Sequence, residues 1–101
     1  MWYAVSLLYE GRSAAKPEVV LWQENIRLIE AASEEEVRAA GVKLGQAGEH
    51  SYEVEGALFT WRFKSVLGTY LIEDFNLESG VEIFSRFLKK GEAESLLTSF
   101  D

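Results

Sequence analysis

The chain has no cysteine, one proline and one histidine among its 101 residues. The lack of cysteine excludes disulfides and thiolate zinc sites, and it fits the reducing cytoplasm, where we expect the protein to reside. Uninterrupted apolar runs are only a few residues long, whereas a membrane-spanning helix needs about 20. The first residues also lack the basic region and the small-residue cleavage site of a signal peptide. We therefore expect a cytoplasmic domain that does not enter a membrane.

Positive charge is scarce as well. The chain carries 17 acidic and 10 basic residues, so its net charge is −7. Because nucleic acids and anionic membranes both attract basic surfaces, we expect neither as a partner. The run Trp61-Arg62-Phe63-Lys64 interleaves aromatic and basic residues, as platforms for single-stranded nucleic acid do, but the overall acidity favours an ordinary amphipathic strand. An acidic domain suits a basic protein partner, or simply stays in solution through its charge.

Residues that carry chemistry are few. His50 is the single histidine, and no serine stands in a Gly-x-Ser-x-Gly elbow, so we predict no catalytic residue. Asp74, Asn76 and Glu78 alternate as at the start of a calcium loop, but the glycine and the final glutamate of such a loop are misplaced. An acidic turn is expected there instead. The glycines form neither a dinucleotide fingerprint nor a phosphate loop, so we predict no metal and no cofactor.

The rest of the composition is that of one folded domain, with 48% hydrophobic, 27% charged and 13% aromatic residues. A chain of this size buries roughly 60–70% of its unfolded surface, which is enough for one core. Residues 2–9 are β-prone, and both of their faces are largely apolar, as in a strand that is covered on both sides. A second strand is expected over residues 19–31, after a polar loop.

Residues 33–48 carry the clearest helix signal. Ser33 is a good N-cap, and Glu36 stands three residues later, as a capping box requires. Gly41 and Gly45 suit a close approach of helix to sheet, and Gly48 suits the C-terminal end. The apolar stripe that should pack on the sheet comprises Val37, Ala40, Gly41, Leu44 and Ala47.

Residues 50–66 read as two strands joined at Glu55-Gly56, and a bulge or bend is expected where the alternation slips at residues 66–68. A turn at residues 73–80, a last strand at 81–88 and a short helix with Leu96, Leu97 and Phe100 complete the pattern. The order β-β-α-β-β-(β)-β predicts an α+β fold with a single, mainly antiparallel sheet. We expect residues 1–88 to form the domain and residues 89–101 to be a C-terminal extension.

One helix can cover only one face of that sheet. The other face of residues 2–9 then needs a cover of its own, because Trp2, Ala4 and Leu8 lie on it. Either residues 92–100 or a second copy of the chain, in a homodimer, could supply that cover.

Several segments together resemble a family of small bacterial proteins that is known only as a domain of unknown function. These segments are WYAVSLLYEG, LWQENIRLIEAASEEEV, EHSYEVEG, WRFKSVLGTYLIED and GVEIFSRFL. The resemblance covers residues 2–88. It implies a bacterial single-domain protein, and it supplies no activity, cofactor or catalytic residue.

Glu24 is the residue that the pattern leaves unexplained, since it interrupts the apolar row of Val20, Trp22, Ile26 and Leu28. An unpaired buried carboxylate is costly, and a bidentate arginine is its best partner. The row Phe84, Arg86, Leu88 predicts Arg86 as that partner, with Arg62 as the second candidate. An internal pair, a partly exposed glutamate and a polar spot in an aromatic-lined concavity all remain open. The candidate binding residues are Trp2, Trp22, Glu24, Trp61, Arg62 and Arg86.

Two functions of different classes follow from these observations. The first is a non-enzymatic protein-binding module, for example an immunity-type protein that neutralises a basic toxin. The second is a small-ligand-binding protein or enzyme that uses an aromatic-lined pocket around Glu24 and Arg86. The first is favoured, because no pairing of a nucleophile with a base is evident.

Overall fold

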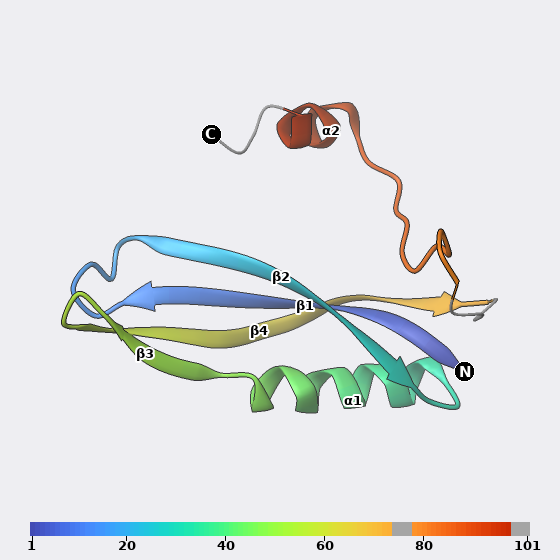
Figure 1. Ribbon diagram of the computed structural model, residues 1–101, viewed down its shortest axis with the longest axis horizontal. Coiled ribbons are helices and arrows are strands. Elements are labelled where there is room, and N and C mark those ends of the chain that lie inside the picture. Colours follow the sequence, from blue (N-terminus) through green and yellow to red (C-terminus); the bar gives the residue numbers. More distant parts are fainter. Residues whose placement is uncertain (74–77, 98–101) are drawn as a thin grey trace.

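The computed structural model describes residues 1–73 and 78–97. It has a four-stranded antiparallel sheet with the strand order β2-β1-β4-β3, and one long helix lies along the sheet (Figure 1). The predicted α+β fold with an antiparallel sheet is confirmed. Its elements, in chain order, are β1 (Trp2–Ser13), β2 (Val20–Glu30), α1 (Glu34–Ala47), β3 (His50–Val54), β4 (Ala57–Ile72) and α2 (Lys90–Leu97).

The core lies between α1 and one face of β1. Side chains alternate between the faces of a strand, so every second residue of β1 points towards the helix. Val5 and Leu7 are fully buried there, as is Val37 of α1. The buried cluster is Tyr3, Val5, Leu7, Tyr9, Ile29 and Val37, with Ala31, Ala40, Trp61, Phe63 and Val66 packed around it.

Glycines set the distance between α1 and the sheet. A methyl group on Gly41 would lie 3.1 Å from Val5 Cγ1 and 3.3 Å from Val66 Cγ2, and one on Gly45 would overlap the ring of Phe63. The hydroxyl of Tyr9 donates a buried hydrogen bond of 2.8 Å to the Gly45 carbonyl. The helix therefore rests directly on the sheet at its glycines, as predicted.

The ends of α1 follow the predicted signals. Ser33 accepts a hydrogen bond from the Glu36 amide, while the Glu36 carboxylate accepts one from the amide of Ala32, and Gly48 is the C-cap. The predicted packing stripe needs one correction, because Leu44 and Ala47 are exposed. The helix contacts the sheet along Val37, Gly41 and Gly45, since close approach at the glycines turns the larger side chains outward.

The β3–β4 hairpin and the irregularity of β4 also match the sequence. Glu55 and Gly56 have φ angles of 52° and 81°, as a tight two-residue hairpin turn requires. The pairing of β1 with β4 shifts twice, between Ser6 and Leu7 and between Leu8 and Tyr9. The first shift falls at residues 66–68, where the sequence predicts a bulge.

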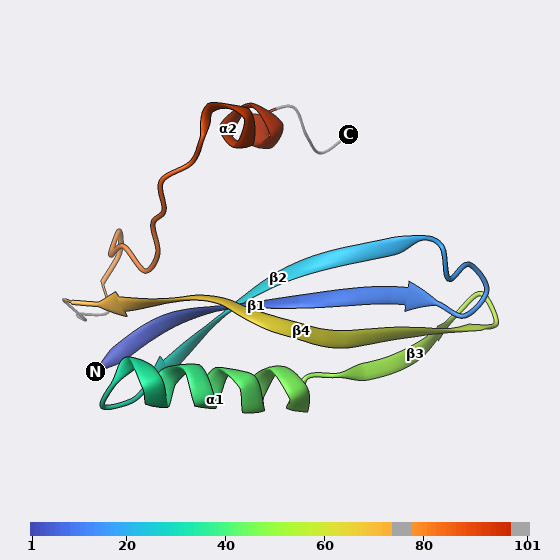
Figure 2. The same cartoon turned by 180° about the vertical axis from the view of Figure 1, so that it is seen from behind.

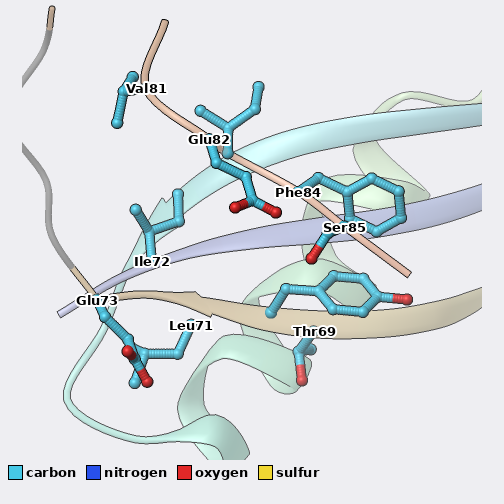
Figure 3. Close-up of a pocket in the computed structure, with 10 residues that line it drawn as sticks. Thr69, Leu71, Ile72, Glu73, Val81, Glu82, Phe84 and Ser85 are labelled. Carbon is cyan, nitrogen blue, oxygen red and sulfur yellow. The ribbon is translucent and has the colours of Figure 1, made fainter. Parts of the chain in front are cut away.

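The predicted last strand at residues 81–88 is wrong, because this segment pairs with no strand in the described part of the chain. Its first part, residues 81–85, crosses over the end of β4 instead of running along a free edge (Figure 3). The ring of Phe84 packs edge-on against Tyr70 at 4.7 Å. Alternation alone predicts a strand, but it cannot tell a strand from an extended segment that lies across a sheet.

Residues beyond this crossing lead away from the sheet. The predicted short C-terminal helix forms as α2, which stands apart from the sheet on the side away from α1 (Figures 1 and 2). Phe87, on the way to α2, is fully exposed. Residues 74–77 of the predicted turn and Phe100 of the predicted helix lie outside the described residues. None of the described helices is long and apolar enough to cross a membrane.

Replacing Gly45 with alanine tests the contact of α1 with the sheet. Alanine favours a helix by about 1 kcal/mol, but overpacking against Phe63 costs about 1–3 kcal/mol. We expect a net loss of up to about 2 kcal/mol, measured by urea unfolding. Gly91→Ala in α2 is the matched control, because nothing lies within 4 Å of the added methyl group. Equal stability of the two variants would contradict the close contact.

Candidate functional site

The face of the sheet opposite α1, here called the open face, is the candidate site. Strand alternation places Ser6 and Leu8 of β1 on it, next to Ile26 and Glu24 of β2. From β4 come Arg62, which is opposite Glu10 in the strand register, and Tyr70, which is opposite Ala4. The open-face residues of β1 and β2 are Trp2, Ala4, Ser6, Leu8, Glu10, Trp22, Glu24, Ile26, Leu28 and Glu30.

The open face carries an exposed apolar stripe along β2. The exposed fractions of Trp22, Ile26 and Leu28 are 56%, 43% and 47%. Beside them, the β1 residues Ala4 and Ser6 are small and buried. Contiguous exposed apolar surface of this kind marks interaction sites in soluble proteins.

Ser6 holds the carboxylate of Glu24. Its hydroxyl, on a residue that is 1% exposed, donates a 2.6 Å hydrogen bond to Glu24 Oε2. In the described part of the chain, Glu24 forms no ion pair with Arg86 or Arg62. The predicted Glu24–Arg86 pair is therefore absent, because Arg86 belongs to the segment that leaves the sheet. The glutamate is an exposed residue, and a serine satisfies one of its oxygens.

Basic residues gather at one end of the open face, around Glu10. The Glu10 carboxylate accepts a 2.6 Å hydrogen bond from Arg12 Nε and lies 3.9 Å from Lys64 Nζ. The Arg12 hydrogen bond lowers the pKa of Glu10 below its ordinary value, and the charges of Arg12, Lys64 and Arg62 act in the same direction. Three cations surround one carboxylate, so this end is locally positive in an acidic protein.

The other end of the open face is acidic. Glu30 is opposite Trp2 in the register of β1 and β2, and it is exposed. Glu82, also exposed, comes from the segment over the end of β4 and lines the same pocket as Ile72. The two ends of the open face therefore carry opposite charges, and the side chains between them are apolar apart from Ser6 and Glu24.

One pocket lies under residues 81–85, between this segment and the end of β4. It has a volume of about 700 Å³, and Figure 3 shows Phe84 among the side chains that line it. Its acidic lining residues are Glu73 and Glu82, and none of the described residues that line it is basic. The second hollow, between α1 and β4, contains Arg38 and Glu49. Among the described residues, neither hollow includes Glu24, Arg86 or a tryptophan.

The three tryptophans do not share one concavity. Trp2 and Trp22 lie at opposite ends of the open face, roughly 27 Å apart along the strands. Trp61 lies on the helix side, where its ring meets Phe59 at 5.3 Å and its Nε1–H donates to the Tyr52 hydroxyl. Of the candidate residues, Trp2, Trp22, Glu24 and Arg62 share the open face, while Trp61 and Arg86 do not.

Sequence reasoning missed Ser6, Glu10 and Arg12. Apart from the two tyrosines, Ser6 is the one residue with a hydroxyl among the apolar residues 2–9. A polar side chain in such a segment needs a hydrogen-bond partner, and this feature could have identified it. The cluster around Glu10 depends on strand register, which the sequence did not supply. The described residues contain no group of histidine, aspartate and glutamate side chains that could hold a metal ion.

The sheet, α1 and residues 81–85 together form the part of the chain that a known protein family shares. The family model described as Domain of unknown function (DUF4288) matches residues 2–85. The chain belongs to this family. The match includes the open face and the crossing segment, and it ends before α2. No curated protein and no solved structure matches the chain.

Substitutions at Ser6, Glu24 and Arg86 test how the glutamate is held. We expect Ser6→Ala to cost about 1 kcal/mol, the typical loss of one hydrogen bond, and Glu24→Ala about 1–3 kcal/mol, because it leaves the buried Ser6 hydroxyl unsatisfied. Arg86→Met should cost less than about 0.5 kcal/mol, as exposed substitutions usually do. Chemical denaturation measures all three. A large loss in Arg86→Met would instead support the Glu24–Arg86 pair.

The charge cluster around Glu10 predicts a pH effect. The folded pKa of Glu10 is below its ordinary value of 4.5, so its stabilisation is present above that value and is lost as pH falls through the folded pKa. NMR titration of the Glu10 carboxyl should show a midpoint below 4.5. In Arg12→Gln the midpoint should rise towards the ordinary value, because the main hydrogen bond is removed. An unchanged midpoint in that variant would contradict this assignment.

Proposed function

We propose that this domain is a non-enzymatic protein-binding module and that the open face is its binding surface. The observation that carries the proposal is the exposed stripe of Trp22, Ile26 and Leu28 beside the oriented carboxylate of Glu24. Interfaces combine a dry apolar centre with a polar rim, and tryptophan is among the commonest energetic anchors. The open face has both features.

The charged groups support a protein partner rather than a small ligand. The Glu10 cluster lies beside Trp22, since Glu10 and Trp22 are opposite each other in the register of β1 and β2. Charges at the rim of an apolar surface steer association and select the orientation of a partner. A cytoplasmic immunity-type protein that neutralises a basic toxin is one form of such a module, and the net charge of −7 suits it.

The alternative, a ligand site or enzyme around Glu24 and Arg86, has less support. Glu24 lies on an exposed strand rather than in either of the described hollows, and Arg86 lies on the segment that leaves the sheet. Catalysis by acid and base requires two groups within reach of one substrate. The hydrogen bond from Ser6 gives Glu24 a structural partner instead.

Site-specific photo-crosslinking tests the proposal in living cells. A photoreactive phenylalanine analogue replaces Ile26 on the open face or, as control, the exposed Lys43 on α1. We expect protein adducts at position 26 and few at position 43, with the adducts identified by mass spectrometry. Similar adduct yields at both positions, or none at position 26, would contradict the proposal.

A second substitution in the Ile26 variant then tests the anchor. Removing an anchor typically costs about 2 kcal/mol, or roughly thirtyfold in affinity, so Trp22→Ala should remove most of the adduct. Leu21→Ala is the matched control, because Leu21 is 53% exposed on the neighbouring position of the same strand but faces the other side of the sheet. Equal losses in both variants would exclude Trp22 as the anchor.

A further inference from the structure

We infer that the free edge of β2 binds an extended, basic segment of a partner protein, which joins the sheet as a further strand. The inference rests on the proposed function and specifies how the partner is held and what its sequence contains. β2 is an outer strand of the sheet, because β1 is its one neighbour among the described strands (Figure 1). Its other edge is therefore open to pairing.

The pairing of β2 with β1 identifies the backbone groups at this edge. The amide of Ala31 donates a 2.8 Å hydrogen bond to the carbonyl of Met1, and the next pair in the register is Glu30 and Trp2. In an antiparallel pair, hydrogen-bonded and non-hydrogen-bonded positions alternate, and the register here is unbroken. The odd-numbered residues of β2 therefore bond to β1, while the N–H and C=O groups of its even-numbered residues point outward.

These outward backbone groups belong to the residues whose side chains form the row on the open face, namely Trp22, Glu24, Ile26 and Leu28. A strand that bonds to them places its own alternate side chains beside this row, since directly opposite residues lie on the same face. In such strand addition the backbone bonds supply affinity and the side-chain pairs supply specificity. One added strand would thus use both the edge of β2 and its exposed apolar side chains.

β2 lacks the features that protect natural edge strands, which are commonly short or carry a proline or a bulge. The outer strand on the other side of the sheet, β3, has only five residues. By contrast, β2 has eleven residues, no proline and no shift in its register with β1. A long, regular edge with exposed apolar side chains is a site for pairing with another chain.

The charges on β2 define the chemistry of the partner. Glu24 is exposed in the open-face row, where its Oε2 accepts the bond from Ser6 and its Oε1 can accept one from a cation. Arg27 is exposed on the other face. An antiparallel segment that fits therefore has a base opposite Glu24, an acid opposite Arg27 and apolar residues opposite Trp22, Ile26 and Leu28.

Other parts of the chain fit this edge less well. In a second copy, the even-numbered residues of β2 would pair with one another, and none of them is basic, so Glu24 would lack a cation. Residues 81–85 lie over the end of β4, where Phe84 packs against Tyr70, and β1 separates β4 from β2. α2 is helical, so its backbone groups bond within the helix. An extended segment of another protein remains as the occupant.

Amide hydrogen exchange of the full chain, measured by NMR, tests the inference. The probe is the capped peptide VEVTRTV, which in antiparallel order runs from Leu28 to Trp22 and places its arginine opposite Glu24 and its glutamate opposite Arg27. Saturating peptide should slow exchange at the outward amides by at least about tenfold, because each alternate amide gains a hydrogen bond. The amides of Asn25 and Arg27 should change little, since they already bond to β1.

The capped peptide VRVTETV is the matched control. It has the same composition, but it places like charges opposite Glu24 and Arg27, so it should bind about tenfold more weakly. In the double variant Glu24→Lys, Arg27→Glu the preference for the two peptides should reverse. Equal binding of both peptides to the wild type would overturn the inferred chemistry of the partner.

Substitution of Ile26 separates pairing at the edge from contact with the face. Ile26→Pro removes one outward amide that has no bond to β1, and Ile26→Ala removes most of the side chain but keeps that amide. We expect VEVTRTV to bind Ile26→Pro about tenfold more weakly than Ile26→Ala. Slow exchange at Asn25 and Arg27 would verify that both variants are folded. Equal affinities would mean that side chains alone hold the peptide, which would overturn strand addition.

The outcomes separate this inference from the proposed function. No protection of the outward amides at about 5 mM peptide, where a millimolar site is mostly occupied, overturns the inference, and crosslinks from position 26 would still support the open face as a binding surface. Protection before any peptide is added also overturns it. Such protection would assign the edge to a second copy if it grows with protein concentration, and to a segment of the same chain if it does not. Protection by the peptide without adducts at position 26 in cells would support the edge as a peptide site and contradict the proposed function alone.

Discussion

The strand β1 is the constraint on which the rest of the structure depends. Its residues from Tyr3 to Leu7 are buried on both faces, although one helix covers only one of them. The helix side is closed by direct contact, which is possible because Gly41 and Gly45 carry no side chain. On the other side the buried residues of β1 are the small Ala4 and Ser6, and residues 81–85 lie over the end of β4, where Phe84 packs against Tyr70. Both faces of β1 are therefore buried, but for different reasons. The helix side is covered by α1, whereas the open face still exposes the apolar side chains of Trp22, Ile26 and Leu28 on β2.

Much of this arrangement could be predicted from local signals. Ser33, Glu36 and Gly48 define the bounds of α1, and Glu55-Gly56 defines the β3–β4 hairpin, because caps and tight turns depend on a few adjacent residues. The exposure of Leu44 could not be predicted, since the contact face of α1 turns towards its glycines only when the sheet is present. The predicted strand at residues 81–88 is wrong for a related reason. Its alternation is that of a strand, but strand formation also needs a free edge with the right register.

On the open face, too, the features that depend on neighbouring residues could be predicted, whereas those that depend on strand register could not. Strand parity places Glu24 correctly in the row of Trp22, Ile26 and Leu28, but parity cannot name a partner on the next strand. Ser6 is that partner through the register of β1 and β2. The two irregularities of β4 have a larger effect, because each changes which side chains face the helix. Phe63 and Val66 both reach the core, while Arg62 and Tyr70 both stay on the open face.

The position of Glu24 is compatible with the proposal that a protein partner covers the open face. A carboxylate in an apolar row would be costly beneath a partner if water were its only hydrogen-bond donor. The bond from Ser6 comes from the same sheet, so it persists when the face is buried. Part of the hydration of Glu24 is still lost on contact, and this loss limits how tightly such a face can bind.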